Sequence, residues 1–355
     1  MLDVVTKFKI EGAPVSCERY GNGHINVTYL LICENNRWYI LQKINKNTFK
    51  NVEALMGNIS AVTKFLQEQD PIRRHTLHLV PTLTGEDYFC DADGEYWRMY
   101  DFITDSLCLD QPETADDFYQ SAVAFGKFQN SLASFPAHTL YETIPNFHNT
   151  VSRYAQLHEA MEKDPCSRLQ DVKEEIEFAL AHESEAGAIC DRLATGELPL
   201  RVTHNDTKLN NVMLDASTRE ALCVIDLDTV MPGSALYDFG DSIRFGASTA
   251  VEDEQDLSKV SVDLALFEAY TKGFLSTCAS SLTPLEIQLL PMGAKLMTLE
   301  CGVRFLTDYL MGDTYFRTHR EKHNLDRCRT QFKLVADMEL KWDAMRRIVE
   351  TIANN

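Results

Sequence analysis

The polar segment between His204 and Asp228 combines residue types that can carry out phosphoryl transfer. It opens with the pattern H-x-D-x-x-x-x-N, which begins at His204, contains Asp206 and ends at Asn211. An apolar stretch then leads into I-D-x-D, with Asp226 and Asp228 as its acids. An acceptor hydroxyl needs a carboxylate that orients it and accepts its proton, and nucleotide phosphates need a divalent cation held by oxygen ligands. The pattern therefore predicts Asp206 as the base, and Asn211 and Asp226 as ligands of Mg²⁺.

Three further residues of this region are expected to support the loop. His204 would brace it by hydrogen bonds, and Asp238 would tie it down. Asp228 is either a second ligand on the metal side or a structural acceptor. The alternative for the whole segment is a pair of β-hairpins with polar turns. The complete set of residues, flanked by apolar strands, favours phosphoryl transfer over that alternative.

Residues that would hold ATP are expected near the N-terminus. Gly21 and Gly23 lie in a predicted hairpin, where small residues let backbone amides approach phosphate, although such a turn is often only a turn. Lys43 lies in the returning strand and is assigned to the α- and β-phosphates, the alternative being a solvated strand lysine. Its carboxylate partner is open between Glu53 and Glu68.

Periodicity places these residues in a sheet that is followed by helices. Strands are expected within 19–32, 37–44, 77–83 and 96–103, with a helix over 52–67. Residues 99–103, with Tyr100 and Phe102, form the expected hinge, whose backbone would hydrogen-bond adenine. Helices are expected over 114–132, 149–161, 169–193, 257–274, 284–310 and 325–353, around a strand-like segment over 198–230. The sequence predicts an α+β, bilobal fold with an antiparallel-sheet N-lobe (1–103) that binds ATP and a mostly helical C-lobe (104–355) that carries the catalytic loop.

The amino-acid composition limits which kinds of binding partner can be expected. The chain has 355 residues, 45% of them hydrophobic, so it can bury the cores of two lobes. Its net charge is −19. No nucleic-acid partner is expected, because binding a phosphate backbone needs clustered Lys and Arg. The ten cysteines form no C-x-x-C pair, and no apolar run approaches a membrane span of about 18 residues. We expect a cytoplasmic protein with reduced thiols, no membrane partner and a monomeric state.

The order of these motifs resembles that of the aminoglycoside phosphotransferase and choline kinase superfamily, which has a protein-kinase-like fold. The resemblance covers nearly the whole chain. A more specific resemblance is to the bacterial N-acetylhexosamine 1-kinase family, through the segments YGNGHIN (20–26), LQKIN (41–45), THNDTK (203–208), RFLTDYL (304–310) and GDTYF (312–316). The resemblance implies Mg²⁺-dependent transfer from ATP to the anomeric hydroxyl of N-acetylglucosamine or N-acetylgalactosamine.

The same resemblance implies a sugar site. Asp206 would face the anomeric hydroxyl, and Arg304 and Tyr315 would hold sugar hydroxyls. Phe245 and His24 would line the pocket. These assignments are carried over by position from the family that the chain resembles.

Arg304 also stands out without the resemblance, because it lies in an apolar helical run with Glu300 one turn earlier. A buried arginine needs a partner, so it forms either a structural pair with Glu300 or a contact with the acceptor. Two other functions stay open: a kinase of an amino alcohol or aminoglycoside, and a kinase-like protein that binds nucleotide without transfer. Arg304 near the acceptor argues against the first, and intact Asp206, Asn211 and Asp226 argue against the second.

Overall fold

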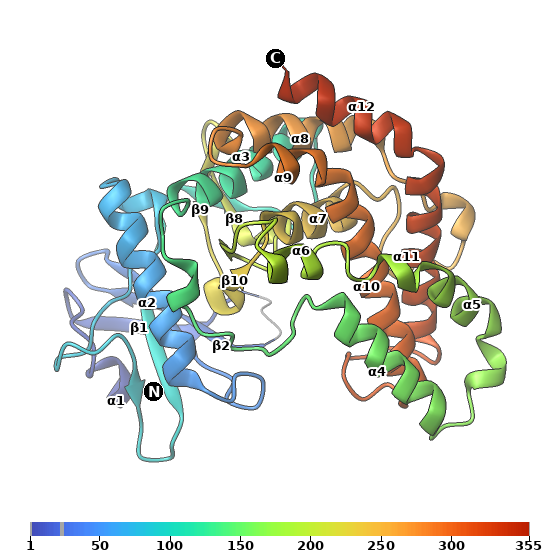
Figure 1. The fold of residues 1–355 in the computed structure, drawn as a ribbon. Helices are drawn as coiled ribbons and strands as arrows, with labels where there is room; N and C mark the ends of the chain where they lie inside the picture. Colours follow the sequence, from blue (N-terminus) through green and yellow to red (C-terminus); the bar gives the residue numbers. More distant parts are fainter. Residues whose placement is uncertain (1, 22–24, 355) are drawn as a thin grey trace.

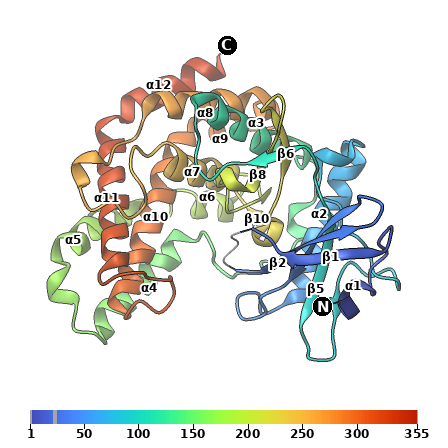
Figure 2. The ribbon, with the colours of Figure 1, turned by 180° about the vertical axis from the view of Figure 1, so that it is seen from behind.

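The computed structural model describes residues 2–21 and 25–354 and has two parts that differ in secondary structure. An antiparallel sheet with one long helix forms the N-terminal part, and helices form most of the remainder (Figure 1). The segment of β8 (Val212–Asp215) and β10 (Met231–Gly233), coloured yellow, lies where the two parts meet, and the view from behind agrees (Figure 2). The predicted α+β fold with an antiparallel N-terminal sheet and a helical C-terminal part is confirmed.

The N-terminal sheet has five strands in the order β1-β2-β3-β5-β4, and each neighbouring pair is antiparallel. The strands are β1 (Pro14–Arg19), β2 (Val27–Cys33), β3 (Trp38–Lys43), β4 (Phe89–Cys90) and β5 (Tyr96–Asp101). A short α1 (Leu2–Val5) precedes them, and α2 (Val52–Gln69) follows β3. The strand expected over 77–83 is not regular, because this segment forms only isolated bridges, such as that between Leu79 and Tyr100.

The two faces of this sheet have different neighbours, because side chains alternate along a strand. Leu41 and Met99 lie on one face and pack in a cluster with residues of α1. Ile40 and Tyr100 lie on the other face and pack in a cluster that includes Leu227 of the C-terminal part. The face of Ile40 and Tyr100 is called the inner face below, because it is directed toward the candidate catalytic segment.

The C-terminal part is built mainly from helices around one large hydrophobic cluster. The helices are α3 (Ala115–Ser131), α4 (Thr150–Lys163), α5 (Lys173–His182), α6 (Cys190–Thr195), α7 (Ala235–Gly246), α8 (Leu264–Cys278), α9 (Pro284–Gln288), α10 (Leu290–Leu310), α11 (His323–Leu340) and α12 (Trp342–Ala353). Thr114 and Thr283 cap α3 and α9, each in a capping box, in which two backbone donors at the helix start are satisfied reciprocally. No helix in the described ranges is long and apolar enough to cross a membrane.

Short strands carry the chain through the junction between the two parts. β6 (Ser106–Cys108), β8 and β9 (Ala221–Val224) form a three-stranded sheet in the order β6-β8-β9. β7 (Arg201–Thr203) pairs with β10. The loop between β7 and β8 and the turn after β9 therefore lie at neighbouring strand ends.

Helical periodicity located most helices, but several predictions were wrong in detail. The single helices expected over 284–310 and 325–353 are each divided in two, as α9 and α10 and as α11 and α12. The helix expected over 169–193 is interrupted, since α5 ends at His182 and α6 begins at Cys190. The helix expected from residue 257 begins at Leu264. α7 was not predicted, and its polar residues, such as Asp238 and Asp241, are buried and bond to the loop at His204 and Thr207 instead of facing solvent.

Candidate active site

Residues 204–211 form a loop that joins β7 to β8. Asn205 has a left-handed backbone with a φ of 66°, a conformation that asparagine tolerates better than most residues. Its Nδ2 donates to the carbonyl oxygen of Thr229 at 2.8 Å, and the Thr229 hydroxyl donates to the carbonyl oxygen of His204 at 2.6 Å. The turn after β9 therefore fixes the start of the loop.

Asp238 on α7 holds the same stretch from the other side. Its Oδ2 accepts hydrogen bonds from the backbone N–H of His204 at 2.9 Å and from Nε2 of Gln129 at 2.7 Å. Its Oδ1 accepts from the backbone N–H of Asn205 at 2.8 Å. Burial raises the pKa of Asp238, although the His204 ring and these donors favour its charged form. This geometry agrees with the loop-supporting role expected for Asp238.

His204 acts as a brace within the loop. Its Nδ1 accepts a hydrogen bond from the backbone N–H of Asp206 at 3.3 Å, so the proton of the neutral ring lies on Nε2. That nitrogen donates to the carbonyl oxygen of Ile225 at 2.9 Å. The ring also packs edge-on against Phe125, with 5.4 Å between ring centroids. Both ring nitrogens are therefore engaged in support, as the sequence suggested.

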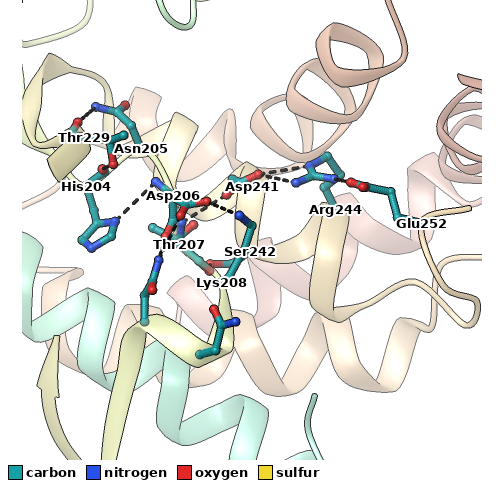
Figure 3. Close-up of polar contacts among 12 residues, drawn as sticks. His204, Asn205, Asp206, Thr207, Lys208, Thr229, Asp241, Ser242, Arg244 and Glu252 are labelled. Atoms are coloured by element: carbon teal, nitrogen blue, oxygen red, sulfur yellow. Dashed lines mark hydrogen bonds and ion pairs between the residues drawn. The ribbon is translucent and has the colours of Figure 1, made fainter. Parts of the chain in front are cut away.

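Asp206 lies at the centre of a small polar cluster (Figure 3). The Nζ of Lys208 is 2.7 Å from its Oδ1, and Nδ2 of Asn211 donates to its carbonyl oxygen at 2.7 Å and to Oδ2 at 3.1 Å. Burial opposes the charge of Lys208, but Asp206 and Asp241 outweigh it and raise the pKa of Lys208. Lys208 was not among the site residues predicted from the sequence, although it lies within the motif, two residues after the expected base.

Strand pairing brings Asn211 next to Asp226. Val212 pairs with Val224, and the backbone N–H of Ile225 donates to the carbonyl oxygen of Asn211 at 2.9 Å. Asp226 follows directly and has a left-handed backbone with a φ of 59°. The two expected metal ligands, which are far apart in the motif, are thus neighbours at one end of the β8–β9 hairpin.

The chemistry of these donors fits Mg²⁺. Desolvation by the surrounding protein, with the negative charges of Asp228 and Asp206, raises the pKa of Asp226 to about 7, although the residue opens to solvent. A cation would relieve that repulsion, and Asn211 can offer Oδ1 because its Nδ2 is engaged. No group of three His, Cys, Asp or Glu residues forms a metal site in the described chain. Mg²⁺ needs no such cage, because it commonly completes its shell with water and phosphate oxygens.

Asp228 connects the catalytic segment to the N-terminal sheet. Its Oδ2 accepts a hydrogen bond from Nδ2 of Asn26, and its Oδ1 forms an ion pair with Arg98. Asn26 in turn accepts from the backbone N–H of Asn45 at 2.9 Å through Oδ1. Both carboxylate oxygens of Asp228 are thus engaged, which favours the structural acceptor of the two roles left open for it.

The expectation for Lys43 does not fit the structure. Lys43 pairs with Trp97 on the sheet face opposite the inner face, and its Nζ lies 3.1 Å from Oε2 of Glu95. Neither proposed partner, Glu53 nor Glu68, forms an ion pair within the described residues, and both are exposed. One residue of register decides this outcome, because consecutive side chains of a strand point to opposite faces.

The expected hinge is partly engaged in the sheet. The backbone N–H of Asp101 donates to the carbonyl oxygen of His78 at 3.0 Å, and that of Phe102 donates to the carbonyl oxygen of Trp38 at 3.1 Å. Tyr100 is 5% exposed and points to the inner face. A contact of this segment with adenine stays a prediction, and at Phe102 it would involve the carbonyl group or the ring.

Two residues expected at the site, Gly23 and His24, lie outside the described residues. Gly21 follows β1 and has a φ of 71°, which glycine adopts without strain. Phe245 is half-buried near the end of α7. The roles of these residues toward phosphate or sugar stay predictions.

Arg304 is surrounded by aromatic rings. Its guanidinium carbon lies 5.4 Å from the ring centroid of Phe316, 5.5 Å from that of Phe147 and 5.8 Å from that of Tyr315. Its Nη2 donates to the hydroxyl of Tyr315 at 3.5 Å. Tyr315 is 69% exposed, so this aromatic cluster opens to solvent. The structure brings Arg304 and Tyr315 together, and their contact with a sugar stays a prediction.

Glu300 has other hydrogen-bond partners than Arg304. It accepts from the hydroxyl of Thr150 at 2.7 Å and lies 2.9 Å from Nδ1 of His148. Nε2 of His148 is 3.3 Å from the carbonyl oxygen of Asn205. Burial would raise the pKa of Glu300, but His148 and Arg304 lower it. The Glu300–Arg304 ion pair, one of the two alternatives for Arg304, does not form, and Glu300 instead links α10 through His148 to the loop at Asn205.

Comparisons with known proteins agree on one family. The sequence profile of the phosphotransferase enzyme family, APH, matches residues 16–271. An aminoglycoside phosphotransferase from Alicyclobacillus acidocaldarius has a similar structure, with a TM-score of 0.64, 13% identity, and coverage of 99% of this chain and 96% of that one. A microcompartment-associated aminopropanol kinase matches with a TM-score of 0.57, 17% identity and coverage of 97% of both chains. An amicoumacin kinase, solved with AMP-PNP and Ca²⁺, matches with a TM-score of 0.55, 11% identity, and coverage of 99% and 92%. These structural similarities concern the fold.

Proposed function

The chain belongs to the phosphotransferase enzyme family and is a small-molecule phosphotransferase, and on this premise we propose that it is an N-acetylhexosamine 1-kinase. The reaction would transfer the γ-phosphoryl group of ATP to the anomeric hydroxyl of N-acetylglucosamine or N-acetylgalactosamine. The observation that carries the transfer is the cluster of Asp206, Lys208 and Asn211 beside Asp226. The sugar rests on the segments that resemble the N-acetylhexosamine 1-kinase family and on the character of the acceptor side.

Asp206 would orient the acceptor hydroxyl and accept its proton. Its Oδ1 lies 2.7 Å from Lys208, whose positive charge can stabilise negative charge that develops on the transferred group. Asn211 and Asp226 would hold Mg²⁺, which neutralises phosphate charge when it is bound. His204 and Asp238 keep the loop in place, so that the reacting groups need little reorganisation.

The proposed acceptor side, to which the resemblance assigns Arg304 and Tyr315, carries arginines and aromatic rings. Arg304 lies among the rings of Phe147, Tyr315 and Phe316. Burial is the main cause that lowers the pKa of Arg153, and the positive charge of Arg304 is the second. Such a surface suits a neutral polyhydroxylated ring, which can stack on aromatic faces and accept hydrogen bonds from guanidinium groups. A cationic amine would meet like charge there, which supports the sugar over an amino alcohol or an aminoglycoside.

A substrate panel tests the proposal. The protein is incubated with ATP, Mg²⁺ and one acceptor at a time: N-acetylglucosamine, N-acetylgalactosamine, glucose, aminopropanol or kanamycin. Phosphorus NMR identifies the product, and we expect a sugar 1-phosphate from an N-acetylhexosamine. Turnover of aminopropanol or kanamycin without any N-acetylhexosamine product would refute the sugar assignment and support the alternative of a kinase for amino acceptors.

The base assignment has its own test, which also addresses a nucleotide-binding protein without catalysis. Asp206→Asn keeps the size of the side chain but cannot accept the proton. General-base catalysis contributes roughly 10²- to 10⁴-fold, so kcat should fall by about that factor while ADP affinity, measured by calorimetry, stays nearly constant. Full activity of Asp206→Asn would reject Asp206 as the base. Absence of turnover in the wild-type protein with every acceptor would favour the non-catalytic alternative.

A further inference from the structure

The inner face of the N-terminal sheet carries a cation on β5. Thr28, Gln42 and Arg98 lie side by side across β2, β3 and β5 in the strand register. Gln42 therefore occupies the position on β3 that is directed toward the catalytic segment, while Lys43 points to the opposite face. β3, which is described in full, presents no cation on its inner face, and Arg98 lies directly beside Gln42 on the next strand.

Arg98 is held in one orientation by several contacts. It is 1% exposed, and its Nε donates to Oε1 of Gln42 at 2.9 Å. Nε2 of Gln42 donates to the hydroxyl of Thr28 at 3.1 Å, and the guanidinium carbon of Arg98 lies 5.3 Å from the ring centroid of Tyr100. Burial alone would lower the pKa of Arg98, but the charge of Asp228 outweighs it. The guanidinium is thus a fixed charge directed at Asp228.

Asp228 transmits that contact to the expected metal ligand. It lies two residues after Asp226, within the 3₁₀ turn Leu227–Thr229. Asn26 binds the second carboxylate oxygen of Asp228, so the N-terminal part holds this side chain at both oxygens. Because the turn is short, the position of Asp228 restricts where the Asp226 carboxylate can lie.

We propose that Arg98 is a positioning residue, which holds Asp226 in place for the metal–nucleotide through Asp228. The inference rests on the proposed kinase function. Loss of the guanidinium leaves Asp228 buried without its counter-charge, and the carboxylate can then leave its site and distort the turn. Partners that orient a metal ligand typically contribute about 10- to 100-fold to metal affinity.

Binding of Mn²⁺ in the presence of ADP tests this without any turnover. The free Mn²⁺ signal in electron paramagnetic resonance reports binding to the wild-type protein, Arg98→Met, Arg98→Lys, Asp228→Asn and the double variant Arg98→Met/Asp228→Asn. Lys43→Met is the matched control, because it removes an ion-paired cation from the same sheet on the other face. Circular dichroism and thermal unfolding report whether each variant is folded.

We expect Arg98→Met and Asp228→Asn each to weaken Mn²⁺ binding by about tenfold or more, and Lys43→Met to leave it within about twofold. Since Arg98 acts through Asp228, the double variant should bind Mn²⁺ no more weakly than whichever single variant has the lower Mn²⁺ affinity. Arg98→Lys should recover part of the loss. If Arg98→Met does not fold, Arg98→Lys and Asp228→Asn supply the same comparison.

Unchanged or tighter Mn²⁺ binding in a folded Arg98→Met protein would overturn the inference, and so would losses that multiply in the double variant. A role in stability alone would lower the unfolding temperature while the folded fraction keeps wild-type Mn²⁺ affinity. Failure of the wild-type protein to bind Mn²⁺ with ADP would instead overturn the proposed function, together with the inference that rests on it.

Discussion

Replacing Asp238 with asparagine should slow turnover without preventing nucleotide binding. Asp238 accepts three hydrogen bonds, two at Oδ2 from His204 and Gln129 and one at Oδ1 from the backbone N–H of Asn205. Asparagine offers one acceptor oxygen and an amide nitrogen that cannot accept. In its least harmful orientation the oxygen replaces Oδ2, and the new NH₂ group then faces the N–H of Asn205.

The expected magnitude follows from that single lost bond. A hydrogen bond to a charged group contributes about 1.5–3 kcal/mol, and the lower cost of burying a neutral amide offsets part of the loss. Asn205 precedes Asp206 directly, so a displaced Asn205 misplaces the base. If the whole free-energy difference acts on the loop, the fraction of molecules with the loop in its active arrangement falls by roughly 10- to 100-fold. We expect kcat to fall by about this factor and ADP affinity to change by less than about threefold.

Steady-state kinetics and thermal unfolding measure these effects, with Asp117→Asn as the matched control. Asp117 is also buried, and it accepts hydrogen bonds from the backbone N–H of Thr114 at 2.8 Å and from Arg219 at 2.7 Å, at the start of α3. Both variants should unfold at a lower temperature, but only Asp238→Asn should lose kcat. An equal loss of kcat in the two variants, or wild-type kcat in Asp238→Asn, would refute the argument that Asp238 acts by fixing the loop.

Three other results can be expected. Lys208→Met removes the cation 2.7 Å from Asp206 and should lower kcat by roughly 10²-fold with little effect on stability, so near-normal kcat in steady-state assays would exclude a role in transfer. Gly240→Ala places a methyl group 2.3 Å from the carbonyl oxygen of Gly293, where α7 crosses α10. Chemical denaturation should show that the free energy of unfolding falls by about 1–3 kcal/mol, and an unchanged value would mean that the two helices move apart without cost. Burial raises the pKa of Cys223 to about 12, so its thiol stays protonated and should resist iodoacetamide at pH 8 in the folded protein. Peptide mass spectrometry should show that it reacts only after unfolding, and rapid labelling of the native protein would contradict this.

Local sequence was sufficient for the elements and for the chemical type of the site. Apolar spacing predicted α2 and β3 nearly to their ends, because the spacing depends on residues only a few positions apart. The H-x-D-x-x-x-x-N spacing likewise grouped Asp206 with Asn211, which the structure brings into hydrogen-bonding contact. Such signals are short-range, so a single sequence contains them in full.

Sequence periodicity could not show where the polar side chains of a buried helix lead. α7 is buried along nearly its whole length, and its polar residues meet other parts of the chain instead of solvent. Its Asp238 and Asp241 nevertheless hold the catalytic loop, at His204 and at Thr207. A supporting role was predicted for Asp238, but the contact of Asp241 with Thr207 and the particular donors to Asp238 depend on how α7 packs against the loop.

The sequence by itself thus determined that the chain carries a phosphoryl-transfer motif, with Asp206, Asn211 and Asp226 in the order that such chemistry needs. Only the tertiary structure decided which cation of the sheet meets that motif. Lys43 was the natural choice along the chain, but one step of strand register turns it toward Glu95, and Arg98 faces Asp228 instead. The contact of Asn26 with Asp228 spans 202 residues. Contacts of that kind depend on which strand faces pack together, and this is a property of the folded chain as a whole.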